Sequence, residues 1–518
     1  MSVAVLGASA IVARFDLVTD LPLSDEWIYR WPLQRVLEGH GVQLWPGVQP
    51  LAAVQLAAAF PLAAAGAAPR LWRLSVLPFL VLFVFFSWRS ARTLGAGRGR
   101  SAFAAVVVAL SPLFLQVTTG LMSDIAYLAL LMGAAWTGQL WLTGRGRAIL
   151  PAAFILLATL ERTHGVGIAL ALVMATVIGP RPASPRSTWP GLALCLLAAA
   201  VGAAAPYVLG LATPAMARPL AAGVLSHTFA NLVGTVVEAP IMASFLLLPL
   251  APLVVARPVD EMRGAGRAAL VPAGWACVAV VAALVFQFGF GTMIFPGDVF
   301  GNWGLGQLHL GGAKTSPWPL PAFYLLEVVV LAVAAVLLFH RRGLWRPSRL
   351  GTQGVFLALL AISQLLPMLS TSATDRYHLA VAAPLAPLLA GSAAGSGLGR
   401  DTLRRSAAAV LVALGLAAFV IGEQDYLAWQ VARDDAARQV YALGTPPAQV
   451  DAGYEAMAKY VALPAVRRTG RLPSELDPSN LAPRHPLLRL QFAPSSAPGP
   501  GTSYGGPSPG RVVRLPAR

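Results

Sequence analysis

Long apolar segments recur along this chain and are separated by short polar loops. Crossing a bilayer takes a helix of about 20 mainly apolar residues. The pattern predicts an all-α polytopic membrane protein with about 13 spans. The predicted spans are residues 3–17, 71–91, 101–119, 125–143, 148–161, 164–179, 189–211, 240–256, 268–290, 321–339, 350–371, 377–392 and 407–422.

Residues 148–179 are the least regular apolar stretch. One continuous helix there would be about 48 Å long at 1.5 Å per residue. It would also bury Glu161, Arg162 and His164 near the bilayer centre, which costs several kcal/mol. The sequence therefore predicts two short helices that meet at residues 161–165, in a protein-lined or watery cavity below the outer surface.

Residues 48–66 are also apolar enough to span. If they did, Asp25 and Asp124 would lie on opposite sides of the membrane. Pro50 and Pro61 make the segment a poor straight helix. We therefore predict a helix that lies in the outer interface.

The loops are of two kinds, and the two kinds alternate. One kind is rich in arginine: residues 89–100, 145–147, 181–186, 257–267, 341–349 and 400–405. The other kind holds small mixed clusters: Asp25–Glu26, Asp124, residues 161–164 and residues 375–378. Because cytoplasmic loops are enriched in Lys and Arg, the mixed clusters are predicted to lie together at the outer face.

Composition supports a membrane protein and excludes several other classes. The 518 residues are 57% hydrophobic and 12% charged, with a mean hydropathy of +0.66, whereas soluble domains carry about 25% charged residues. The net charge of +16 reflects basic loops that face an anionic inner leaflet, so no nucleic-acid partner is expected. Cys195 and Cys277 lie in apolar runs, without metal-binding spacing. No glycine-rich phosphate loop follows a strand.

Hydropathy falls after residue 422. We therefore divide the chain into a transmembrane domain at 1–422, a small extracytoplasmic region at 423–492 and a tail at 493–518. The middle region has helical patterning that is interrupted at residues 444–447. The tail is rich in Pro, Gly and Ser and is predicted to be disordered.

The outward carboxylates admit two interpretations. Asp25 and Glu26 open an amphipathic segment, where acidic residues stabilise a helix N-terminus or where a carboxylate can act as a general base. Asp124 follows Ser123, so the two can serve as a helix cap or belong to a site.

The outward basic residues are equally open. Arg162 and His164 can satisfy helix ends, or they can bind an anion, because arginine presents a planar fork of donors that suits phosphate. Arg376 and His378 lie at another outer turn, which can be a simple interfacial anchor or part of the same phosphate site.

The order of these motifs resembles the GT-C glycosyltransferases of the protein O-mannosyltransferase and lipid A aminoarabinose transferase type, glycosyltransferase family 39. The resemblance covers about residues 20–395. Its motifs are the acidic pair, RLWRLS at 70–75, SPLFLQ at 111–116, LMSD at 121–124, LATLERTHGVG at 157–167 and DRYHLAVAAPLAPLL at 375–389. The resemblance implies a GT-C fold of eleven to fourteen membrane helices, an outward active site and sugar donors on a polyprenyl phosphate carrier.

The resemblance also implies roles for single residues. The acidic pair Asp25–Glu26 and the second outward acid, Asp124, match the family's acidic positions, and all three are expected to be catalytic, with Asp25 as the catalytic carboxylate. The donor phosphate is expected to contact a basic set: Arg162, His164, Arg376 and His378. Many relatives carry lysine at the position of Arg162.

We therefore expect an inverting transfer, with Asp25 as base, from a lipid-phosphate sugar to a lipid, glycan or protein acceptor. It would take place at the outer face of the bacterial cytoplasmic membrane. A transporter or flippase is the alternative, although such proteins usually place their sites at the midplane of repeated halves. A membrane-anchored assembly protein acting through its tail is a third possibility. Mg²⁺ or Mn²⁺ is possible, but dispersed carboxylates are too few to assign it.

Overall fold

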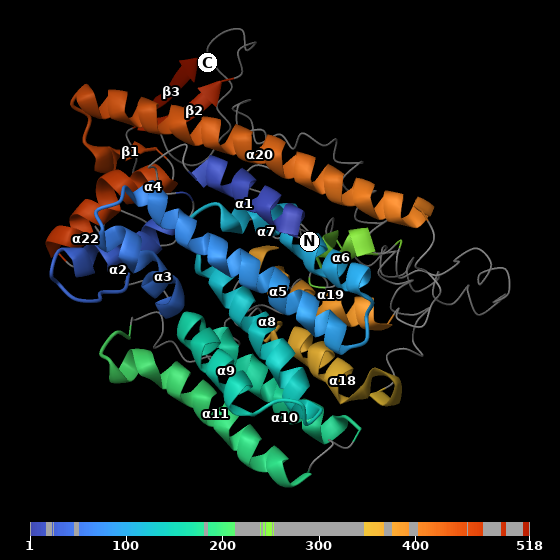
Figure 1. Cartoon of the computed structure of the whole chain (residues 1–518). Helices are drawn as coiled ribbons and strands as arrows, with labels where there is room; N and C mark the ends of the chain where they lie inside the picture. Colours follow the sequence, from blue (N-terminus) through green and yellow to red (C-terminus); the bar gives the residue numbers. More distant parts are fainter. Residues whose placement is uncertain are drawn as a thin grey trace, which may run out of the picture.

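A computed structural model of the chain gives the arrangement of its helices (Figure 1). It describes residues 2–16, 23, 25–45, 51–180, 185–212, 239, 242–243, 245–250, 252, 347–366, 375–392, 402–452, 454–469, 488–493 and 511–516. The spans predicted at 268–290 and 321–339, and much of the one at 240–256, lie outside these residues.

Within the described residues, every other predicted span contains a helix. These elements are α1 (Ser2–Asp16), α4 (Pro69–Trp72), η1 (Arg73–Val76), α5 (Leu77–Thr93), α6 (Arg98–Ala109), α7 (Pro112–Thr118), α8 (Ser123–Leu142), α9 (Ile149–Glu161), η2 (Thr163–Gly165), α10 (Val166–Ile178), α11 (Pro185–Val208), η3 (Leu248–Leu250), α18 (Pro347–Ser363), η7 (Asp375–Tyr377), α19 (His378–Ser392) and α20 (Thr402–Ala442).

Length and composition make this a multi-pass membrane protein. In the part of the chain that the structure describes, four helices are long and apolar enough to cross a membrane, or five if α6 and α7, bent by 62° at their junction, form one span. Several shorter apolar helices accompany them. The predicted number of 13 spans is not confirmed.

Helix α8 lies at the centre of the bundle, between α5 and α9 (Figure 1). Nearly all of its side chains are buried. In a membrane, helices associate through close packing that small residues permit. A Cβ atom added to Gly133 would lie 2.5 Å from the ring of Phe154, and one added to Gly138 would lie 2.9 Å from Phe356. Glycine therefore sets the approach of α9 and α18 to α8, and α8 carries Asp124 at its first turn.

The break predicted within residues 148–179 is confirmed. Helix α9 ends at Glu161, Arg162 is extended with φ −146° and ψ 135°, and η2 leads into α10. A Cβ atom at Gly165 would lie 2.5 Å from the backbone nitrogen of Thr159. The chain turns this tightly only because residue 165 has no side chain.

Two short helices, α2 (Glu26–Leu37) and α3 (Ala53–Ala64), lie beside the junction. With 12 residues, α3 is about 18 Å long, too short for a bilayer, which agrees with the prediction that residues 48–66 do not span. Its N-terminus is fixed by Glu161, whose carboxylate accepts the N–H groups of Val54 (2.8 Å) and Gln55 (3.0 Å). A carboxylate at a helix N-terminus is electrostatically favourable.

Helix α20 does not end where hydropathy falls. It runs unbroken for 41 residues, about 62 Å at 1.5 Å per residue. The domain boundary predicted at residue 422 therefore lies inside one helix. The break expected at residues 444–447 is present, and Gly444 there has a φ of +91°.

Beyond α20 lie η9 (Pro447–Gln449), β1 (Val450–Asp451), α21 (Tyr454–Met457), the π-helical turn η10 (Ala458–Ala462), α22 (Leu463–Thr469), β2 (Leu488–Ala493) and β3 (Arg511–Pro516). The strands form a parallel sheet in the order β1-β2-β3. The all-α prediction missed this sheet, and β3 lies within the tail predicted to be disordered. Backbone pairing with a distant segment leaves little trace in local composition.

Helix α2 is held on two faces. One face packs on the bundle through Tyr29, Leu33, Trp72, Leu121 and Met122. The other packs on the C-terminal region through Trp27, Trp31, Trp45, Met457, Ala458, Val461, Ala462 and Val466. Arg467 adds an ion pair to Glu38 at 2.7 Å. Figure 1 shows α2, α3 and α22 gathered at the same end of the molecule.

Candidate functional site

Asp25 and Arg376 are 351 residues apart in sequence and form an ion pair. Asp25 is the residue that precedes α2, and Arg376 lies in η7 before α19. The Nη2 atom of Arg376 is 2.7 Å from Oδ2 of Asp25, and the two side chains are 11% and 23% exposed. We refer to Asp25 and Arg376 as the accessible pair.

A second ion pair lies deeper. Asp124 in the first turn of α8 accepts a hydrogen bond of 2.7 Å from Nη2 of Arg162, and Nε of Arg162 donates to Oγ of Ser123 at 3.0 Å. Both charged side chains are almost fully buried. Removing either one would leave the other as an uncompensated buried charge. We refer to Asp124 and Arg162 as the buried pair.

Two tyrosines join the pairs. The guanidinium groups of Arg162 and Arg376 each lie 5.7 Å from the ring centroid of Tyr377, within the range of cation–π attraction. The Tyr29 hydroxyl is 3.0 Å from Oγ of Ser123. The two acids and two arginines predicted from sequence therefore converge, and they come from four separate segments.

The sequence interpretation missed both tyrosines as site residues. Tyr29 follows Asp25 by four residues, a spacing that brings side chains together on one helix face. Tyr377 directly follows Arg376. The sequence shows that each tyrosine is close to a charged residue. It does not show that Tyr377 lies between Arg162 and Arg376, because that contact depends on the fold.

The two predicted histidines differ in their surroundings. The His164 ring lies 5.8 Å from that of Tyr377 and 6.2 Å from that of Tyr127, both in edge-on contact. It is therefore at the edge of the cluster. His378 is the first residue of α19 and is fully buried.

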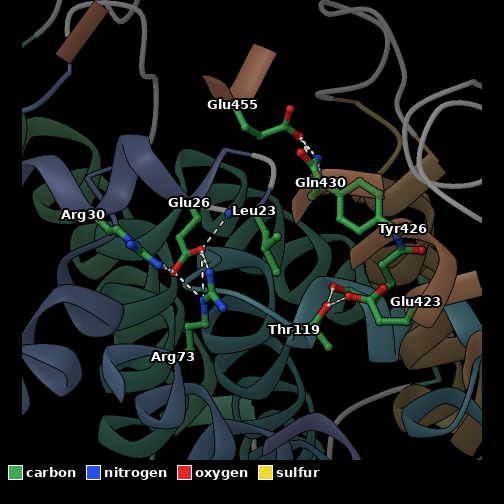
Figure 2. A network of polar contacts seen from close by, with 10 residues as sticks. Leu23, Glu26, Arg30, Arg73, Thr119, Glu423, Tyr426, Gln430 and Glu455 are labelled. Carbon is green, nitrogen blue, oxygen red and sulfur yellow. Dashed lines mark hydrogen bonds and ion pairs between the residues drawn. The ribbon is translucent and has the colours of Figure 1, made fainter. Parts of the chain in front are cut away.

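Glu26 occupies a different environment from Asp25, although it is the next residue. It is fully buried and accepts hydrogen bonds from Arg30 (2.8 and 2.9 Å), from Arg73 (2.8 to 3.1 Å) and from the backbone N–H of Leu23 (2.9 Å) (Figure 2). Burial raises the pKa of the Glu26 carboxyl, but Arg30 and Arg73 outweigh it and bring that pKa down to about 2. A carboxylate this acidic is a poor base, and its geometry suits holding α2 against η1.

A further polar network, not predicted from sequence, runs along α20 (Figure 2). Thr119 donates to Glu423 at 3.1 Å. Higher on the helix, Tyr426 and Gln430 donate to Glu455 of α21 at 3.0 and 2.7 Å. These contacts connect the C-terminal region to α20.

Within the described residues, no group of three or more His, Cys, Asp or Glu side chains is arranged to hold a metal. No Mg²⁺ or Mn²⁺ site is therefore assigned in this part of the chain.

The site combines a partly accessible carboxylate with two guanidinium groups and aromatic rings. Arginine forks bind phosphate oxygens well, and a carboxylate beside them can accept a proton. The geometry suits an anionic ligand that carries a reactive group next to Asp25.

No protein-family model matches the chain, and no curated protein matches it. Two solved structures do, both of ArnT, the lipid A aminoarabinose transferase, from Cupriavidus metallidurans. One is bound to undecaprenyl phosphate and the other is in the apo state. Each is 16% identical and covers 86% of this chain, with 81% and 80% of the ArnT chain covered and TM-scores of 0.41 and 0.37.

Proposed function

We propose that this chain is an integral-membrane glycosyltransferase that moves a sugar from a polyprenyl phosphate carrier to an acceptor. The observation that carries the proposal is the convergence of the accessible pair and the buried pair around Tyr377 and Tyr29. Arg162 and Arg376 can bind the phosphate, and the Asp25 carboxylate can accept a proton from the acceptor hydroxyl. The motif resemblance to GT-C glycosyltransferases supports the same function.

The proposed reaction is a single displacement. The acceptor oxygen attacks the anomeric carbon while the bond from that carbon to the phosphate oxygen breaks, so the anomeric centre inverts. Asp25 accepts the proton of the acceptor hydroxyl. The bonding electrons leave with the phosphate, and Arg162 and Arg376 stabilise its growing negative charge in poorly hydrated surroundings.

The charge pattern supports the proposed orientation. Helix α8 begins with Asp124 at the site and ends near Arg145 and Arg147. Loops rich in arginine favour the cytoplasmic side, so the site would lie at the outer face of a bacterial cytoplasmic membrane.

The test is to incubate the purified full-length protein with a panel of polyprenyl-phosphate sugars and to measure sugar release or transfer by mass spectrometry. The wild type should consume at least one donor. Asp25→Asn should lose at least about a hundredfold in rate, since a general base contributes about 10² to 10⁴. The matched control is Asp435→Asn, because Asp435 is an exposed acid on α20 that pairs with Arg438.

Wild-type turnover by Asp25→Asn would remove Asp25 from the mechanism. A transporter or flippase would be favoured instead if no donor is turned over and a labelled lipid moves across the bilayer of proteoliposomes that contain the protein.

A further inference from the structure

The hydroxyl groups of Tyr29 and Ser123 form a pair whose hydrogens can be counted. Arginine has donors only, so Oγ of Ser123 accepts the Nε–H of Arg162. One hydrogen bond of 3.0 Å joins the two hydroxyls. Two hydroxyls carry two hydrogens, and that bond uses one of them. In the described part of the chain, no acceptor takes the second hydrogen.

This spare hydrogen is buried, so water does not readily satisfy it. Ser123 is fully buried and Tyr29 is 6% exposed. A buried donor without an acceptor costs about 1–3 kcal/mol. Such a cost is reasonable at a binding site, where a ligand supplies the missing acceptor.

The surroundings of Tyr29 identify the kind of acceptor. Burial raises the pKa of its phenol to about 12, and both arginines and both aspartates of the two ion pairs act on it. The phenol therefore stays protonated at neutral pH, at a point that feels both cations of the site. An oxygen drawn there by Arg162 and Arg376 would be anionic.

We propose that this spare hydroxyl hydrogen donates to an oxygen of the donor's phosphate group, so that Tyr29 and Ser123 form the uncharged part of the anion site. The inference rests on the proposed function and extends it. Arginines supply charge, whereas a buried hydroxyl fixes the position of one oxygen. A neutral donor also leaves the net charge of the two ion pairs unchanged.

The test measures the Kd of the purified full-length protein for undecaprenyl phosphate, undecaprenol and inorganic phosphate. Tyr29→Phe should weaken binding of undecaprenyl phosphate about tenfold to a hundredfold, the range for a hydrogen bond to a charged group. Binding of undecaprenol should not change. Tyr207→Phe is the matched control, because Tyr207 lies on the exposed face of α11.

Ser123→Ala should also weaken binding of undecaprenyl phosphate, and adding it to Tyr29→Phe should cost little more, since the two hydroxyls act together. Thermal unfolding checks that each variant is folded. Should Tyr29→Phe fail to fold, Ser123→Ala decides, and an unchanged Kd there overturns the inference.

The outcomes separate the inference from the proposed function. A wild type that binds undecaprenyl phosphate, with an unchanged Kd in Tyr29→Phe, overturns the role of Tyr29 alone. A wild type that does not bind undecaprenyl phosphate overturns the proposed function. Inorganic phosphate that binds as tightly as the lipid overturns the assignment to a lipid headgroup.

Discussion

Asp25 and Glu26 are adjacent carboxylates at the start of α2, yet they have different partners. Asp25 is partly accessible and pairs with Arg376, whereas Glu26 is enclosed by Arg30 and Arg73. A helix turns successive side chains by about 100°, so neighbours in sequence face different surroundings. The Asp25 carboxylate is therefore partly exposed, where a ligand can reach it, whereas the Glu26 carboxylate holds the helix in place.

Glu26→Gln should destabilise the protein by about 3–5 kcal/mol, because it removes the buried carboxylate that forms ion pairs with the buried Arg30 and Arg73. The free energy of unfolding of Glu26→Gln should also depend less on pH than that of the wild type. The pKa of Glu26 falls from 4.5 to about 2 on folding, so the wild type keeps this stabilisation above pH 4.5 and loses it as the pH falls towards 2. Thermal unfolding in detergent between pH 2 and 7 measures both effects.

The control for this experiment is Glu38→Gln, since Glu38 is partly exposed and pairs with Arg35 and Arg467 at the surface. It should change stability by less than about 1 kcal/mol. A Glu26→Gln protein of wild-type stability that transfers no sugar would instead make Glu26 catalytic.

At the scale of elements, the break between α9 and α10 positions the buried pair. Arg162 reaches Asp124 because its backbone is extended between two short helices. Glu161, one residue earlier, fixes the start of α3. The break between α9 and α10 therefore places the Arg162 cation in the site, and the adjacent Glu161 holds the N-terminus of α3 next to the break.

Gly165→Ala should destabilise the protein by about 1–3 kcal/mol, since the new methyl group would overlap the backbone at Thr159 and force a shift of the turn between α9 and α10. Displacement of Arg162 should also weaken binding of undecaprenyl phosphate. Gly99→Ala in α6 is the control, because no atom lies within 4 Å of its added Cβ. Equal thermal stability and equal Kd in both variants would show that the turn at residue 165 tolerates a side chain.

The sequence was informative about features that leave local patterns. Apolar runs located α5 and α8, and the cost of burying Glu161 and Arg162 in lipid predicted the break between α9 and α10. Pairings across long separations leave no such pattern. Arg73 with Glu26, Tyr377 between two arginines and the parallel strands of the C-terminal region therefore came only from the fold.

At the scale of the whole molecule, the C-terminal region is part of the support of the site. Helix α2 directly follows Asp25 and carries Tyr29. One face of α2 packs on the bundle, and Trp27 and Trp31 on its other face pack on residues 457–466 of the C-terminal region. The network of Glu455 with Tyr426 and Gln430 fixes the same region to α20. Movement of α2 is thereby limited from both sides.

Val461→Asp should release the C-terminal region from α2, because it places a carboxylate in this apolar cluster without a partner. Limited proteolysis should then cut residues 454–469 faster, and the rate of sugar transfer should fall about tenfold as Asp25 loses its fixed position. Leu443→Asp is the control, since Leu443 is exposed at the end of α20. Faster proteolysis with an unchanged transfer rate would show that the bundle alone positions α2.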